Sequence, residues 1–370
     1  MKPGTSLFPN AFGRAVLVFL CAKLFVGSFA LAAGHDPLDP VTYARWDSGH
    51  YLTIASRGYS FAPCPPGDPA RWCGNTAWLP GYPLLIRGLE RIGLAGPVGG
   101  LLVTAAAHLA LLWWIARRVP IIQDMHGWLI LALAGLFPGM IYYHAIFPIA
   151  LFTLCALLCL EALETDRPGW TFVWGLCAAL AYGPGLLLAP VAGLRMLAFS
   201  GKIARKLGRG VLAATGPLIG FALALTIQFM DTGEPFAFFH LQRQYGRDFD
   251  PVGVLTWLIE QAWTSPFRPV RIAASQSLFV ASVTLVTLWF ARPSRSTVHL
   301  AAYLYLALLW LFFISIGRGI SLYRSEACLM PAFILLYMNM NRPRVLFALF
   351  TCFLLLAGLL CDLFFRGMLV

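Results

Sequence analysis

The run VLFALFTCFLLLAGLLCDL, residues 345–363, is almost wholly apolar and is long enough to cross a bilayer as a helix. Similar runs recur along the 370 residues, of which 59% are hydrophobic and only 12% charged. A soluble domain usually has about 25% charged residues. Because the apolar runs are continuous rather than alternating, they predict an all-α polytopic membrane protein and not a β-barrel.

These runs predict about nine to twelve membrane-spanning helices in one domain covering residues 1–370. The expected spans lie near residues 12–33, 98–116, 128–144, 149–163, 170–182, 184–198, 210–230, 270–290, 297–316, 326–341 and 345–363. Several are shorter than the roughly 20 residues of a straight span, and Phe147-Pro148 and Gly183-Pro184 divide neighbouring pairs. Such pairs predict broken helices or close helical hairpins.

The net charge of +11 is spread among the loops and is not gathered in a basic domain or arm, which argues against nucleic-acid binding. With the N-terminus in the cytoplasm, the cytoplasmic loops contain Arg117, Arg118, Lys202, Arg205, Lys206, Arg209, Arg292, Arg295, Arg342 and Arg344. This positive-inside bias predicts large extracytoplasmic loops at residues 34–97 and 231–269 and leaves Lys23 inside the first span. We expect that first span to remain uncleaved, since its apolar run is too long for a typical signal peptide.

Cysteine usage leaves one disulfide open and indicates no structural zinc site. Cys64 and Cys73 flank the loop CPPGDPARWC, which the topology places outside, where an oxidising compartment would allow them to pair. The other cysteines lie in apolar spans and fit as small hydrophobes. The sequence predicts no cofactor and leaves a divalent metal open, since no second His or acid follows His50 at clear ligand spacing.

The segment RWDSGHYLTIASRGY, residues 45–59, places ionisable groups beside apolar sequence. Tyr43 to Arg57 has helical periodicity, so Asp47, His50 and Tyr51 fall on one face, and Val252 to Trp263 is similarly amphipathic. We expect both to be interfacial helices. A partly desolvated aspartate is a natural general base, and the alternative is a solvated position on an interfacial helix. Nearby Asp36 and Asp39 are candidates for capping a helix start.

Several segments resemble the PIG-V-type mannosyltransferases, the second mannosyltransferase family of the glycosylphosphatidylinositol pathway, and their bacterial relatives. Residues 46–59, WDSGHYLTIASRGY, resemble the family's first luminal loop, and this is the most specific likeness. Looser likenesses follow in the family's order: NTAWLPGYPLLIRGL at 75–89, LFPGMIYYHAIFPIALF at 136–152, PFAFFHLQRQYGR at 235–247 and SLYRSEACLMPAF at 321–333.

The resemblance implies a GT-C glycosyltransferase that moves a sugar, usually mannose, from a polyprenyl-phosphate donor to a hydroxyl of a lipid, glycan or protein acceptor by inverting displacement. Asp47 matches the family's acidic base, and His50 is expected to orient it or to contact substrate. Cations are expected at the donor phosphate, where charge develops. The candidates are Arg324 first, then Arg318, Arg243 and Arg247. Trp46, Tyr51, Tyr82 and His144 are expected at the substrate, and an interfacial aromatic belt is the alternative for the aromatic residues.

The chain departs from the family pattern at Phe147-Pro148-Ile149, where relatives often carry a carboxylate, and His144 lies nearby as a possible substitute. It also has Gly183-Pro184 where many relatives have Arg-Pro. Two other functions stay open: a polyprenyl-phosphate or lipid transporter, and a non-catalytic membrane subunit. The brief loops favour a bacterial inner membrane with the site facing the periplasm over the endoplasmic reticulum.

Overall fold

The computed structural model describes residues 11–64, 71–118, 125–197, 202–244, 249–291, 299–316, 322–338 and 342–369, and these residues are mostly helical. Five of their helices are long and apolar enough to cross a membrane: α1 (Ala11–Ala32), α4 (Gly96–Arg118), α9 (Ile203–Thr232), α12 (Arg268–Phe290) and α16 (Pro343–Phe365). They indicate a multi-pass integral membrane protein, as the sequence predicts.

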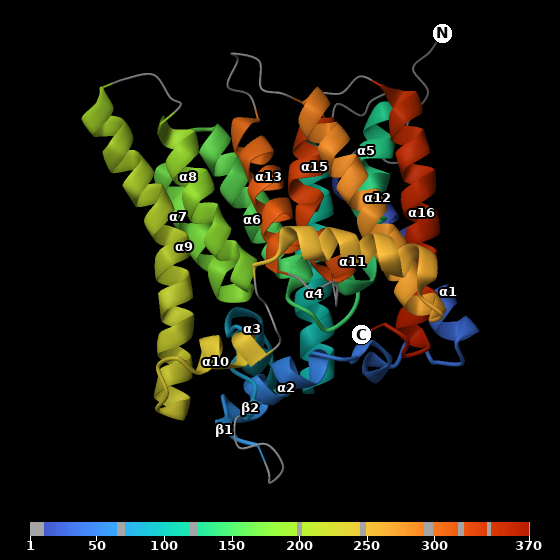
Figure 1. Cartoon of the computed structure of the whole chain (residues 1–370), viewed down its shortest axis with the longest axis horizontal. Coiled ribbons are helices and arrows are strands. Elements are labelled where there is room, and N and C mark those ends of the chain that lie inside the picture. Colours follow the sequence, from blue (N-terminus) through green and yellow to red (C-terminus); the bar gives the residue numbers. More distant parts are fainter. Residues whose placement is uncertain are drawn as a thin grey trace.

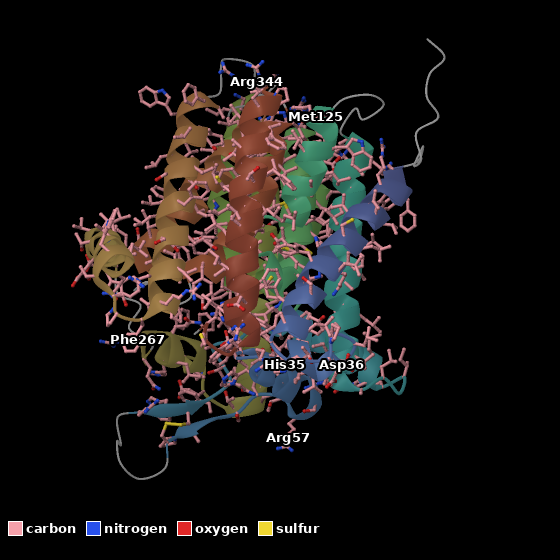
Figure 2. The ribbon with its side chains drawn as sticks, turned by 90° about the vertical axis from the view of Figure 1, so that its right-hand side faces the viewer. His35, Asp36, Arg57, Met125, Phe267 and Arg344 are labelled. Atoms are coloured by element: carbon pink, nitrogen blue, oxygen red, sulfur yellow. A yellow bond between two sulfur atoms is a disulfide. The ribbon has the colours of Figure 1, made fainter. Side chains whose placement is uncertain are left out.

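The helices stand upright as a bundle, with α9 at one side and α16 at the other, and the two ends of the bundle differ (Figure 1). At the upper end α4 finishes in Arg117 and Arg118, and Arg342 begins α16. Figure 2 places Arg344 at this end, and His35, Asp36 and Arg57 at the opposite one. Arg117, Arg118, Arg342 and Arg344 therefore gather at one end of the bundle.

Shorter helices fill the space between the long ones and come in pairs. They are α5 (Met125–Gly135) with α6 (Ile149–Glu164), α7 (Pro168–Ala181) with α8 (Leu188–Leu197), and α13 (Leu300–Ile316) with α15 (Met330–Tyr337). Their connections contain the 3₁₀ turns η2 (Met140–Tyr143), η3 (Gly183–Leu187) and η4 (Ala327–Leu329), and the short helix α14 (Leu322–Glu326). Pro148 caps α6 and Gly183 begins η3, so both predicted breaks are confirmed.

The predicted continuous span over residues 128–144 is wrong, because α5 ends at Gly135 and Pro138 and Gly139 turn the chain. Gly139 has φ +81°, which suits glycine, and a Cβ there would lie 2.9 Å from the backbone oxygen of Tyr323. The turn therefore places η2 directly against α14. The predicted span over 326–341 is likewise interrupted, by α14 and η4 before α15 begins.

Charged side chains on the short helices form an ion pair inside the bundle. Arg195 of α8 is fully buried and its Nη2 lies 3.0 Å from Glu164 at the end of α6. The other carboxylate oxygen of Glu164 accepts a 2.7 Å hydrogen bond from the backbone N–H of Ala301 in α13. One carboxylate thus ties together a helix from each of the three short pairs, as a buried charge requires.

Small elements cover the lower end of the bundle. The predicted loop 34–97 forms η1 (Pro40–Tyr43), α2 (Ser48–Arg57), the antiparallel strands β1 (Phe61–Pro63) and β2 (Trp72–Gly74), and α3 (Gly81–Glu90). The disulfide between Cys64 and Cys73, which the sequence leaves open, is present and closes this hairpin. The hairpin itself has no signal in the sequence. The second loop forms α10 (Ala237–Gln244) and α11 (Pro251–Thr264).

The two loops are joined. Gln244 of α10 accepts a 2.8 Å hydrogen bond from the backbone N–H of Trp72 and donates a 2.9 Å bond to its carbonyl. Helix α11 runs across the upright helices instead of along them (Figure 1). The amphipathic stretch Val252 to Trp263 is thus confirmed as helical.

Candidate functional site

The segment before α2 is not the continuous helix that the periodicity predicts from Tyr43. Asp39 caps η1 by accepting a 2.9 Å hydrogen bond from the N–H of Val41, and Trp46 has φ +54°, which is unfavourable for a bulky residue. This backbone breaks the helix, so α2 starts only at Ser48 with Asp47 as its N-cap residue. Strained residues of this kind often mark functional sites.

The Asp47 side chain is not used for capping, although its position would allow it. It makes no hydrogen bond to the first turn of α2. Instead, Oδ2 of Asp47 forms an ion pair with Nη1 of Arg324, which lies on α14. The Asp47 side chain keeps 24% and the Arg324 side chain 15% of its accessible surface, so the pair is sheltered but open to small molecules.

Aromatic residues surround the Arg324 guanidinium. Its central carbon lies 5.6 Å from the ring centroid of Phe147, close enough for a cation–π contact. Tyr51, Tyr142 and Tyr182 lie within electrostatic range of the same group. Nε of Arg324 is buried and has no hydrogen-bond partner among the described residues. The guanidinium thus retains an unused donor beside its carboxylate partner.

His50 lies one turn into α2 and stacks on Trp78, with ring centroids 3.6 Å apart and an interplanar angle of 13°. Burial lowers the pKa of His50 below its ordinary value, although the nearby Asp47 carboxylate opposes the shift. The ring is therefore neutral at neutral pH. A neutral imidazole beside Asp47 suits orientation or hydrogen bonding better than neutralisation of a phosphate.

Tyr51 lies on α2, about one helical turn after Asp47, and is buried. Its ring makes edge-to-face contacts, with centroids 5.7 Å from that of Tyr82 and 6.0 Å from that of Phe147. Burial raises the pKa of Tyr51 well above its ordinary value, and Asp47 adds to the shift. The phenol therefore keeps its proton. Of the predicted substrate residues, Tyr51 is the one that the fold places at the ion pair.

Tyr82, also predicted at the substrate, is instead a buried residue that packs α3 against α4. It is fully buried, and its hydroxyl oxygen lies 2.8 Å from the carbonyl of Gly100 and 2.9 Å from the hydroxyl of Thr104 on α4. The preceding Gly81 allows close packing, because a Cβ there would lie 2.7 Å from the backbone of Leu180. The LPGYP segment therefore anchors α3 and presents no Tyr82 atom to solvent.

Arg87 of the same segment holds α2 in place. Its Nε and Nη2 each donate a 2.6 Å hydrogen bond, to the carbonyls of Ala55 and Ile54 in the last turn of α2. Carbonyls at a helix end lack partners within the helix and carry partial negative charge, so a guanidinium suits them. Arg87 thereby positions the helix whose first residue follows Asp47.

The remaining predicted residues lie elsewhere. Trp46 is 41% exposed and adjoins the site through the backbone. Arg243 is exposed on α10. His144 is fully buried and contacts His108 and Phe19 inside the bundle. Arg318 and Arg247 lie outside the described residues.

Several residues at the site were not singled out by the sequence analysis: Ser48, Tyr142, Phe147 and Tyr182. Ser48 is buried beside Asp47, and its Oγ has no hydrogen-bond partner among the described residues. Phe147 and Tyr142 belong to the segment 136–152 already noted, yet only the turn at Gly139 brings them to α14. Across the described ranges no three His, Cys, Asp or Glu side chains are placed to hold a metal ion.

No protein-family model matches this chain, and no curated protein matches it in a sequence comparison.

Proposed function

We propose that the protein is a GT-C-like glycosyltransferase that moves a sugar, mannose in the first instance, from a polyprenyl-phosphate donor to a hydroxyl acceptor. The observation that carries the proposal is the sheltered ion pair of Asp47 and Arg324. Asp47 precedes α2, which lies at the end of the bundle opposite the basic ends of α4 and α16 (Figure 1). A base and a cation side by side are what transfer from a lipid phosphate to an alcohol requires.

Asp47 is the proposed general base. The acceptor oxygen attacks the anomeric carbon from the face opposite the phosphate, and its proton passes to Oδ2 of Asp47. The bond between that carbon and the phosphate oxygen breaks, so polyprenyl phosphate leaves with the electron pair and the anomeric configuration inverts.

Arg324 is the proposed partner of the leaving phosphate. Its buried Nε is an unused donor, and phosphate oxygens accept strong, charge-assisted bonds from guanidinium groups. In the ligand-free protein the cation holds Asp47. A donor phosphate competes for the same guanidinium and thereby frees the carboxylate for the acceptor.

The proposed site faces the extracytoplasmic side, the periplasm of a bacterial inner membrane. The basic ends of α4 and α16 lie at the opposite end of the bundle, which supports this orientation. The hairpin disulfide also fits an oxidising compartment. A lipid-linked donor would reach the site from the outer leaflet, and a lipid, glycan or protein alcohol from the aqueous side.

The decisive experiment follows label from polyprenyl-phosphate mannose radiolabelled in the sugar, added to membranes containing the full chain. We expect the label to enter an acceptor in the wild type and transfer to fall at least about 100-fold in Asp47→Asn, given the size of typical base effects. Glu260→Gln is the matched control, because this carboxylate is exposed on α11. Movement of intact donor across the membrane without transfer would establish the transporter instead, and wild-type turnover of Asp47→Asn would remove the proposed base.

A further inference from the structure

A second polar cluster lies inside the bundle, away from the ion pair. Lys23 is near the middle of α1, His108 is on α4, and His144 directly follows η2. The ring of Phe19, one turn before Lys23 on α1, touches all three. Its centroid lies 5.7 Å from Nζ of Lys23, 5.6 Å from the His108 ring and 6.3 Å from the His144 ring. Ionisable groups in the interior of a membrane protein are expensive, and each needs a reason.

The two histidines are buried and lack partners. His108 is 1% exposed and His144 is 0% exposed. All four of their ring nitrogens lack a hydrogen-bond partner among the described residues. Leaving buried polar atoms unpaired costs about 1–3 kcal/mol each, and most such atoms in native proteins are satisfied by protein, water or an ion. Two unpaired rings in contact therefore point to a missing ligand.

Lys23 has the same deficiency. Its ammonium lies 5.7 Å from the ring centroid of Tyr43 as well as from that of Phe19. Across the described ranges its side chain makes no ion pair or hydrogen bond with the protein. Lys23 is partly buried, and aromatic faces offset only part of the cost of a cation that has lost some of its water. A negative charge is the missing element.

We infer that Lys23, His108 and His144 form a binding site for one small monovalent anion of halide size. The donors suit an anion, because the ammonium carries three N–H groups and each neutral imidazole carries one. A metal cation is disfavoured by the Lys23 charge and by the lack of a carboxylate or thiol cluster among the described residues. The ring centroids of the histidines are 5.0 Å apart with the rings perpendicular, so a ligand that touches both must be small.

The anion would join α1, α4 and the turn after η2, because Lys23, His108 and His144 lie on these three elements. Tyr43, which contacts Lys23, accepts a 3.2 Å hydrogen bond at its carbonyl from the N–H of Ile146, two residues after His144. A bound anion therefore stabilises the junction between α1, η1 and the turn after η2. This site is independent of the proposed transfer reaction, since its ligand and its measurement are different.

Bromide tests the inference directly, because its anomalous X-ray scattering identifies the ion. Crystals of the full chain grown in bromide should show one anomalous peak at hydrogen-bond distance from Nζ of Lys23 and from a ring nitrogen of His108 or His144. In detergent at constant ionic strength, replacing gluconate by bromide or chloride should raise the thermal unfolding midpoint by about 3 °C or more.

Variants separate this effect from general salt effects. Lys23→Met should abolish the dependence of the midpoint on anion identity, even if removing a partly buried charge raises the midpoint itself. Lys202→Met, which removes an exposed lysine before α9, should leave the dependence unchanged. Density for water alone, with no bromide peak at the cluster, would overturn the inference, as would equal midpoints of the wild type in gluconate and bromide.

Discussion

Asp47 and Arg324 are 277 residues apart in the sequence, and their side chains form an ion pair. Asp47 precedes α2 at the lower end of the bundle. Arg324 lies on the short helix α14, between the apolar helices α13 and α15. The pair therefore joins a surface loop to the interior of the bundle. Neither partner is fully buried, so the contact can open when another charged group competes for it.

Removing one charge of this pair should cost more stability than removing both. Asp47→Asn leaves the Arg324 guanidinium without its partner, and we expect a loss of about 1–3 kcal/mol, between the values for exposed and buried pairs. Arg324→Gln should cost a similar amount, and the double variant should cost less than the sum. Unfolding free energies of the four proteins in one detergent measure the interaction.

Arg57→Lys is the control for changes of arginine chemistry, because Figure 2 shows Arg57 at the lower edge, away from the bundle. Strict additivity in the cycle would show that the two charges do not interact in solution.

Arg87→Met should loosen α2 and thereby misplace Asp47. The variant loses two hydrogen bonds from a charged donor to the carbonyls of Ala55 and Ile54, and we expect a loss of about 2–3 kcal/mol. Faster hydrogen exchange in residues 48–57 would locate the effect. Arg91→Met, an exposed arginine at the end of α3, should have no such effect, and equal exchange in both variants would contradict the role given to Arg87.

The sequence predicts most helices because bilayer burial demands long apolar runs, and such runs are visible without any knowledge of packing. The spans predicted at 128–144 and 326–341 are too long, because hydropathy does not report where the backbone turns. The turn at Gly139 depends on the close approach of Tyr323, which belongs to a distant segment. Local sequence contains no signal for that contact.

At the site, the sequence singles out Asp47 and Arg324 but not their pairing. Both fall in segments recognised by resemblance, whereas the contact depends on the helix breaks before α2 and at α14, which only the fold reveals. The same limit explains Tyr82. Aromatic residues between prolines suggest an exposed loop, yet the bonds to Gly100 and Thr104 fix this one inside the protein. His144 is near the departing segment in the sequence, but in the fold its ring lies beside His108.

Acidification should weaken the fold partly through His50. Burial lowers its pKa in the folded protein below the ordinary value of 6.5, so the unfolded chain binds the proton more readily. The stability from neutral His50 is present above about pH 6.5 and is lost as the pH falls through the lower, folded-state pKa. His50→Phe keeps the stack on Trp78 without a titrating group.

Thermal midpoints of both proteins between pH 8 and pH 5 measure this term. The wild type should lose more stability than His50→Phe on acidification, and the difference should appear below about pH 6.5. Parallel curves would show that protonation of His50 is not coupled to folding.

The disulfide should protect the hairpin from proteolysis. Replacing both Cys64 and Cys73 by Ser removes a cross-link over a short loop, for which about 2–3 kcal/mol of stabilisation is typical. Trypsin cleavage after Arg71, which adjoins β2, should then accelerate by more than about tenfold. Unchanged cleavage would mean that the bonds of Gln244 to Trp72 hold the hairpin without the cross-link. Intact vesicles should be cleaved only when trypsin reaches the proposed extracytoplasmic face.

Helix α11 should lie in the hydrocarbon edge of the outer leaflet. The N–H of Asp250, its N-cap residue, donates a 2.8 Å hydrogen bond to the carbonyl of Ser315 in the last turn of α13. Helix α13 has 17 residues, so its far end lies about 25 Å from its start, against a hydrocarbon thickness of about 30 Å. The outward face of α11 is apolar, with Trp263 81% exposed and Val252 70% exposed.

Phospholipids carrying a chain-terminal photoreactive diazirine should therefore label Val252 and Trp263, as located by mass spectrometry, and should spare the buried Leu258 of the same helix. Labelling of Val252 and Trp263 by a water-soluble carbene reagent instead would place this helix in the aqueous phase.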